Sequence, residues 1–215
     1  SYFCLENRFW RIIGLDTGYN TKVFPFLDLF LGTSIHAENL KWLKRVVFAD
    51  REDHRPVIVL THHQWFSSFD RGYPRLGPQL HPYLGDVALW FWGHEHRFAG
   101  YAPYSPDGGV KVRGRCIGHG GMPVEIAQPA NLHVPVVFVD NRVSGKEDGE
   151  PLGYCGSALL EFEGPLLRVR YIDERDEELL VEEGVSGGAA GGVNGKIRSA
   201  SRALTWFRHR EYLVQ

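Results

Sequence analysis

The chain has 215 residues, of which 43% are hydrophobic and 23% are charged. These proportions are typical of a globular protein, and the length suits one large domain or two small ones. The net charge is −2, which argues against binding nucleic acid through bulk neutralisation of phosphates. No apolar run approaches the roughly 20 residues of a membrane span, so we expect no membrane partner. The cysteines, Cys4, Cys116 and Cys155, are an odd and widely spaced set, which predicts reduced thiols and a cytoplasmic location.

The first 50 residues predict a hairpin followed by a helix. Two β-like runs, residues 2–5 and 9–15, are joined by a short polar segment, which is typical of a hairpin. The chain opens with Ser1 and with a strand already under way, so we expect it to be the C-terminal part of something longer. A stripe of apolar residues then predicts a helix over residues 36–50, with Ser34 as its N-cap. The stripe consists of Leu40, Leu43, Val46 and Val47.

Two buried strands follow, and each ends in a pair of histidines. Residues 57–61 are a continuous apolar run that leads into His62 and His63, and residues 87–92 lead into Gly93, His94, Glu95 and His96. A continuous apolar run indicates a strand that is buried on both faces. Ligand sites of open α/β sheets lie at the carboxyl ends of the strands, so we expect the four imidazoles to share one sheet edge. Imidazole is the commonest side-chain metal ligand and suits Zn, Mn, Fe, Ni or Co.

The remainder of the chain predicts a short helix and an antiparallel sheet region. The helix is expected over residues 78–84, and strands over residues 98–101, 110–117, 134–139, 157–162 and 166–172. Residues 173–183 hold seven acids and are interpreted as a solvated edge. Half of residues 184–195 are glycine, which is typical of a flexible linker. Residues 196–215 are basic and aromatic, and are interpreted as a docking helix or a disordered tail.

Three segments of the sequence resemble the C-terminal half of a calcineurin-like metallophosphoesterase. They are Val-Ile-Val-Leu-Thr-His-His-Gln at residues 57–64, Ala-Leu-Trp-Phe-Trp-Gly-His-Glu-His at residues 88–96, and Ile-Ile-Gly-Leu-Asp at residues 12–16. That family carries a strand-end histidine and then a G-H-x-H motif on the next strand. The resemblance covers residues 2–172 and implies an α/β/β/α sandwich with a two-metal site at its sheet edge. The implied domains are a metallophosphoesterase-like domain over residues 1–183, the linker over 184–195 and the tail over 196–215.

The resemblance also implies a ligand set for two divalent metal ions. His62 and His94 would bind one ion, His96 would bind the other, and His63 would be a neighbouring or second-shell group. Such a pair of ions polarises a phosphoryl oxygen and generates hydroxide from a bridging water. The implied reaction is hydrolysis of a phosphoester, either a small molecule or a phosphoprotein.

The sequence departs from the family pattern in its first half. No D-x-H motif and no Asn-His dipeptide occurs, and Gly85-Asp86 stands in the wrong place for the family's G-D pair. We therefore name no general acid. Three explanations stand open: the missing half lies upstream, it comes from another chain, or the protein is a degenerate member. The last option corresponds to the alternative function, a non-catalytic interaction or regulatory module acting through the basic aromatic tail.

Further residues near the predicted sheet edge have two interpretations each. His119, which follows a strand end, is either a substrate contact or a solvated residue of a tight turn. Asp16 either orients a metal-ligating histidine or bonds its own backbone in a turn. The aromatic loop that contains Trp65, Phe66 and Phe69 either covers the metal edge, bringing Arg71 or Arg75 towards phosphate, or packs onto the domain.

Overall fold

The computed structural model describes residues 1–19, 32–50, 53–84, 87–121, 123–186, 196–199 and 204–207. Its larger sheet has eight strands. In spatial order these are β1 (Phe3–Glu6), β2 (Arg11–Leu15), β3 (Val57–Thr61), β4 (Val87–Trp92), β6 (Gly114–Ile117), β5 (Phe98–Tyr101), β7 (Val136–Val139) and β14 (Thr205–Trp206). The sheet is mixed, because β2, β3, β4 and β6 run parallel while the outer pairs are antiparallel.

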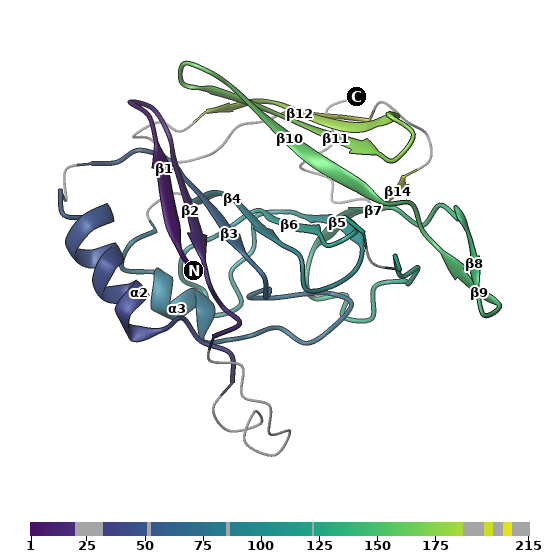
Figure 1. The fold of residues 1–215 in the computed structure, drawn as a ribbon, viewed down its shortest axis with the longest axis horizontal. Coiled ribbons are helices and arrows are strands. Elements are labelled where there is room, and N and C mark those ends of the chain that lie inside the picture. The colour runs from purple at the N-terminus through teal and green to yellow at the C-terminus, as the bar shows by residue number, and fades with distance from the viewer. Residues whose placement is uncertain are drawn as a thin grey trace.

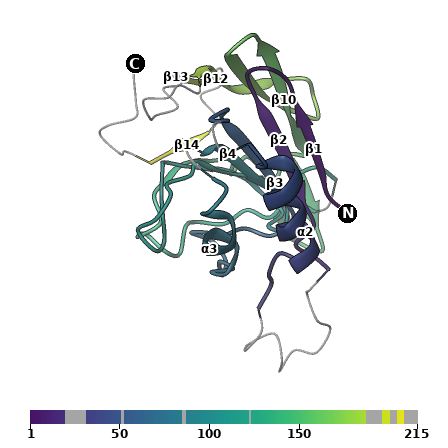
Figure 2. The same cartoon turned by 90° about the vertical axis from the view of Figure 1, so that its left-hand side faces the viewer.

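A second, antiparallel sheet lies over one face of the first (Figure 1). Its strands are β10 (Gly156–Glu163), β11 (Leu166–Asp173), β12 (Glu178–Ser186) and β13 (Lys196–Ser199), and a separate hairpin is formed by β8 (Gly145–Glu147) and β9 (Glu150–Leu152). The helices α2 (Ala37–Trp42), η1 (Leu43–Val47) and α3 (Leu76–Leu80) cover the opposite face of the first sheet (Figure 2). The α/β sandwich expected from the sequence is therefore confirmed. The described residues form three of its layers, which are one layer of helices and two sheets.

The two faces of the first sheet each bury an apolar core. In β3, Val57 and Val59 pack towards the helices, whereas Ile58 packs towards the second sheet. All three are at most 3% exposed. Successive side chains of a strand point to opposite faces, so a strand covered on both sides needs apolar residues at every position. This explains the continuous apolar run.

The parallel strands β2, β3 and β4 end at the same level. Leu15 on β2 is in register with Thr61 on β3, and Thr61 is in register with Trp92 on β4. The residues that follow each strand therefore emerge together at one edge of the sheet. That edge receives Thr17 from β2, the pair His62 and His63 from β3, and the G-H-E-H turn from β4.

The predicted helix exists, but two of its details are wrong. Its N-cap is His36, whose Nδ1 accepts a hydrogen bond from the backbone of Glu38 at 3.3 Å, rather than Ser34. After Trp42 the helix continues as a π-helix, which changes the face that each residue presents. Leu43 and Val47 are buried, while Val46, which the sequence placed in the apolar stripe, is 64% exposed.

The C-terminal half also differs from the sequence interpretation in places. The short helix is α3, which begins two residues and ends four residues earlier than expected, and the acidic stretch contributes to strand β12 rather than only to a solvated edge. Residues 184–186 end β12, and the rest of the expected linker, 187–195, lies outside the described residues. In the expected tail, residues 196–199 form strand β13 of the second sheet and residues 205–206 form strand β14 of the first sheet. These residues do not form a helix. Residues 200–203 and 208–215 lie outside the described part.

Two observations bear on the environment of the chain. Among the described residues, none of the helices has the length and apolar character required to span a bilayer. Cys4, Cys116 and Cys155 are all free thiols.

Candidate metal centre

The candidate site lies where β3 and β4 end. The backbone N–H groups of Gly93 and His94 both donate to the carbonyl oxygen of His62, at 3.1 and 2.8 Å. These bonds continue the pairing of the two parallel strands by one residue. They fix the turn that carries His94 directly beside His62.

Three imidazoles converge at this edge. The Nε2 atom of His62 lies 3.1 Å from Nδ1 of His94, and the ring of His63 lies 4.7 Å from that of His62 and 4.6 Å from that of His94. One nitrogen of each ring lies within 4.8 Å of the others. Two nitrogens that bind one tetrahedral ion at 2.0–2.1 Å are about 3.3 Å apart, so His62 and His94 are spaced to share an ion.

The electrostatics of the site favour neutral imidazoles. Burial lowers the pKa of His62, and the charge of His96 lowers it further. Burial likewise lowers the pKa of His94, together with the charge of His62. Only an unprotonated nitrogen has the lone pair that a metal requires, so the pair is in its ligating form at neutral pH. The donor set therefore fits a borderline transition-metal ion.

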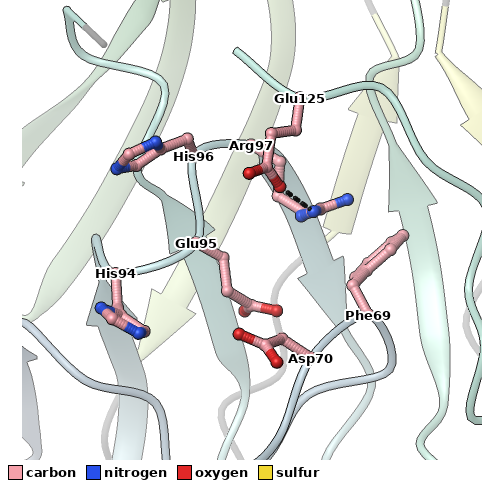
Figure 3. Close-up of a pocket in the computed structure, with 7 residues that line it drawn as sticks. All are labelled: Phe69, Asp70, His94, Glu95, His96, Arg97 and Glu125. Carbon is pink, nitrogen blue, oxygen red and sulfur yellow. Dashed lines mark hydrogen bonds and ion pairs between the residues drawn. The ribbon is translucent and has the colours of Figure 1, made fainter. Parts of the chain in front are cut away.

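His96 faces a cavity next to the three-imidazole group. The cavity has a volume of about 400 Å³, and Figure 3 shows His94 and His96 along one side of it. His96 is not a member of the group of three. The cavity is lined by Phe69, Asp70, His94, Glu95, His96, Arg97 and Glu125.

Glu95, between the two histidines, points away from them and fixes the turn. Its buried carboxylate accepts hydrogen bonds from the hydroxyl of Ser67 and the indole N–H of Trp92, at 2.5 and 3.0 Å. Burial raises the pKa of this carboxyl group. Its carboxylate lies beside that of Asp70 in the lining of the cavity (Figure 3). The hydrogen bond between Glu95 and Ser67 attaches the turn that carries His94 and His96 to the loop that follows β3.

The positive charge in the cavity wall is already paired. Arg97 donates to Glu125 at 2.5 Å, and its guanidinium lies 4.5 Å from the centre of the Phe69 ring. Its side chain is only 6% exposed, whereas that of Glu125 is 59% exposed. This pair closes the side of the cavity opposite the histidines (Figure 3).

Two residues at the site, Thr17 and Tyr73, were not predicted from the sequence. The hydroxyl of Thr17 lies 3.0 Å from Nδ1 of His63 and accepts a hydrogen bond from the backbone N–H of His63 at 3.0 Å. The hydroxyl of Tyr73 lies 3.2 Å from Nε2 of His94. Thr17 could have been predicted, because it follows a predicted strand and ligand sites lie at the carboxyl ends of parallel strands. Tyr73 gave no local signal.

The remaining predicted site residues lie elsewhere. Asp16 accepts hydrogen bonds from the backbone of Gly18 and Tyr19, at 2.9 and 3.0 Å, which is the turn interpretation. His119 is 2% exposed, stacks on Phe98 at 4.9 Å and does not line the cavity. His119 is turned away from the cavity because side chains alternate along β6 and its extension, and this alternation directs His119 towards the second sheet, on the same side as Ile117. Burial lowers its pKa to about 4.

The aromatic loop after β3 mainly packs onto the domain. Trp65 and Phe66 are 3% and 4% exposed, and they contact Trp90 and Trp92 on β4 at 5.8 and 5.7 Å between ring centres. Phe69 alone of the three predicted aromatic residues lines the cavity. The loop therefore serves mostly to anchor the site to the sheet.

Comparison with known proteins agrees with this geometry. Residues 2–98 match the family model of the calcineurin-like phosphoesterases, so the resemblance stated from the sequence is confirmed. A purple acid phosphatase from yellow lupin (Lupinus luteus) seeds has a similar structure, with a TM-score of 0.55 and 18% sequence identity. The match covers 81% of this chain and 30% of that chain. A search of curated proteins found no match.

Proposed function

We propose that this chain belongs to a metal-dependent hydrolase of phosphoester bonds. The observation that carries the proposal is the approach of His62 Nε2 to His94 Nδ1, 3.1 Å apart at the ends of adjacent parallel strands. The calcineurin-like phosphoesterase match over residues 2–98 includes both histidines. The chain spans 30% of the similar purple acid phosphatase, so the activity is proposed for the whole protein.

The proposed ligand set follows the resemblance. His62 and His94 would hold one divalent ion, and His96, two residues further along the same turn, would hold a second. Bound ions of this kind supply polarisation of a phosphoryl oxygen and activation of water. The chain itself contributes neutral imidazoles, a turn fixed by Glu95, and a cavity of about 400 Å³ for the ester.

Imidazoles alone do not neutralise two divalent ions. Within the described residues, the one group of at least three ligating side chains consists of His62, His63 and His94. We propose that carboxylate ligands come from a segment preceding Ser1 or from another chain. The substrate would be a small phosphoester or a phosphoprotein. The free thiols of Cys4, Cys116 and Cys155 support a proposed cytoplasmic location.

The experiment is hydrolysis of p-nitrophenyl phosphate and bis-p-nitrophenyl phosphate by the intact protein. The protein is first stripped with a chelator and then loaded with Zn²⁺, Mn²⁺, Fe²⁺, Ni²⁺ or Co²⁺. We expect turnover only after loading, and its loss in His62→Asn and His94→Asn but not in the control His54→Asn, whose side chain is exposed. Absence of both metal binding and turnover would contradict the proposal and favour a non-catalytic module.

A further inference from the structure

His94 is contacted at both of its ring nitrogens. Its Nδ1 lies 3.1 Å from Nε2 of His62, and its Nε2 lies 3.2 Å from the hydroxyl of Tyr73. A neutral imidazole has one N–H donor and one nitrogen with a lone pair. If Nδ1 is the nitrogen that binds the ion beside His62, the proton must reside on Nε2. The Tyr73 oxygen is placed to accept a hydrogen bond from that N–H.

Tyr73 itself is held firmly in this position. It is 5% exposed, and its backbone N–H donates to the carbonyl of Gln64 at 3.1 Å, which closes the loop after β3. The ring of His63 lies edge-on to the Tyr73 ring at 4.6 Å. The guanidinium of Arg71 lies 5.1 Å from the centre of the same ring. The hydroxyl therefore has little freedom to turn away from His94.

His63 is fixed in turn by β2. Thr17 contacts both the ring Nδ1 and the backbone N–H of His63 through one hydroxyl, each at 3.0 Å. Thr17 and His63 are 0% and 4% exposed. A continuous set of contacts thus leads from the end of β2 through His63 and Tyr73 to His94. All the groups in it come from neighbouring strand ends and one closed loop.

We propose that Tyr73 is a positioning residue of the metal centre, which holds the Nε2–H of His94 and so directs Nδ1 of that ring to the ion. Thr17 and His63 keep Tyr73 in place. The inference rests on the proposed function, because it assumes that His62 and His94 bind a metal. Groups that orient a metal-binding histidine in this way contribute 10- to 100-fold to metal affinity.

The test compares Tyr73→Phe with the matched control Tyr83→Phe in the intact protein. Tyr83 donates its hydroxyl to the carbonyl of Leu40 at 3.3 Å, on the helix layer rather than at the site. Zn²⁺ affinity is measured by competition titration. The His94 tautomer is read by ¹⁵N NMR of the metal-free protein, assigned with His94→Asn. We expect Tyr73→Phe to weaken Zn²⁺ binding at least 10-fold and to lose the Nε2–H preference, and Tyr83→Phe to change neither.

Thr17 provides a second, graded comparison. Thr17→Val removes the hydroxyl that holds His63, whereas Thr17→Ser keeps it. We expect several-fold weaker Zn²⁺ binding in Thr17→Val and near wild-type binding in Thr17→Ser. Unchanged affinity and tautomer in Tyr73→Phe would overturn the assignment. If the unmodified protein bound no metal, the proposed function would fail, and an unchanged tautomer in Tyr73→Phe would separately exclude the positioning role.

Discussion

Arg115 on β6 and Glu182 on β12 form an ion pair that is buried between the two sheets. Two nitrogens of Arg115 contact the two carboxylate oxygens of Glu182 at 2.7 Å each, and both side chains are 2% exposed. Tyr171 donates its hydroxyl to the same carboxylate at 2.6 Å. The pair connects the sheet that carries the histidines to the sheet that covers it, so it affects stability rather than chemistry.

Removing one partner of this pair should be costly. Arg115→Met leaves the carboxylate of Glu182 buried without its counter-charge, which costs about 3–5 kcal/mol of unfolding free energy. Urea unfolding of the metal-free protein measures this loss. The double variant Arg115→Met with Glu182→Leu should recover part of it. The control is Lys41→Met, which breaks an exposed pair with Glu38 (57% and 61% exposed) and should change stability far less than Arg115→Met does. Equal effects of the two single variants would contradict this account.

Gly118 should tolerate no side chain. A Cβ at this position would collide with the backbone carbonyl oxygens of Glu95 and Gly93, which belong to the turn that carries His94 and His96. We expect Gly118→Ala to displace that turn, to lower stability by about 1–3 kcal/mol and to weaken Zn²⁺ binding at least 10-fold. Gly145→Ala is the matched control, because a Cβ there meets open space. Wild-type Zn²⁺ affinity in Gly118→Ala would show that the turn is not so confined.

The buried His119 should make the protein sensitive to mild acid. Burial lowers its pKa from 6.5 to about 4, so the folded state binds this proton less readily than the unfolded state does. The corresponding stability is fully present above pH 6.5 and is lost as the pH falls towards 4, by about 3 kcal/mol at most. We expect His119→Phe, which preserves stacking on Phe98, to flatten the pH dependence of unfolding in this range. If the unfolding free energy of the variant depended on pH as steeply as that of the unmodified protein, His119 would be excluded as the cause.

Metal binding should persist below the pH at which ordinary histidines protonate. The pKa values of His62 and His94 are both lowered from 6.5, chiefly by burial. Protons therefore compete with the metal at a lower pH than they would at ordinary histidines. With ordinary pKa values, two half-protonated imidazoles would already weaken binding about fourfold at pH 6.5. For such an ordinary pair the affinity would fall about threefold between pH 7.5 and 6.5. Competition titrations with Zn²⁺ at these two pH values should give a smaller fall, and a fall of threefold or more would contradict the lowered pKa values.

The elements that the sequence predicted well are those set by local pattern. The continuous apolar run of β3 and the two β-like runs of the opening hairpin required no knowledge of distant residues. The position of His62 and His94 followed from a rule about parallel strand ends, which holds for the register of β3 and β4. The wider helix turn at residues 43–47 did not follow, because residues four apart, such as Leu43 and Val47, share a face in a regular helix as well.

The features that the sequence did not predict depend on partners far along the chain. Tyr73 acts on a histidine 21 residues away, and Thr17 on one 46 residues away. Glu182 has the appearance of a solvated acid until Arg115, 67 residues earlier, is brought against it. In the same way, His119 follows a strand end as a ligand would, but the alternation of β6 turns it towards the second sheet.

The most direct test of the metal centre is anomalous diffraction at the zinc edge from crystals of the intact protein grown with Zn²⁺. We predict an anomalous peak at 2.0–2.1 Å from both Nε2 of His62 and Nδ1 of His94. Absence of any peak between these two rings, with zinc bound elsewhere or not at all, would contradict this prediction.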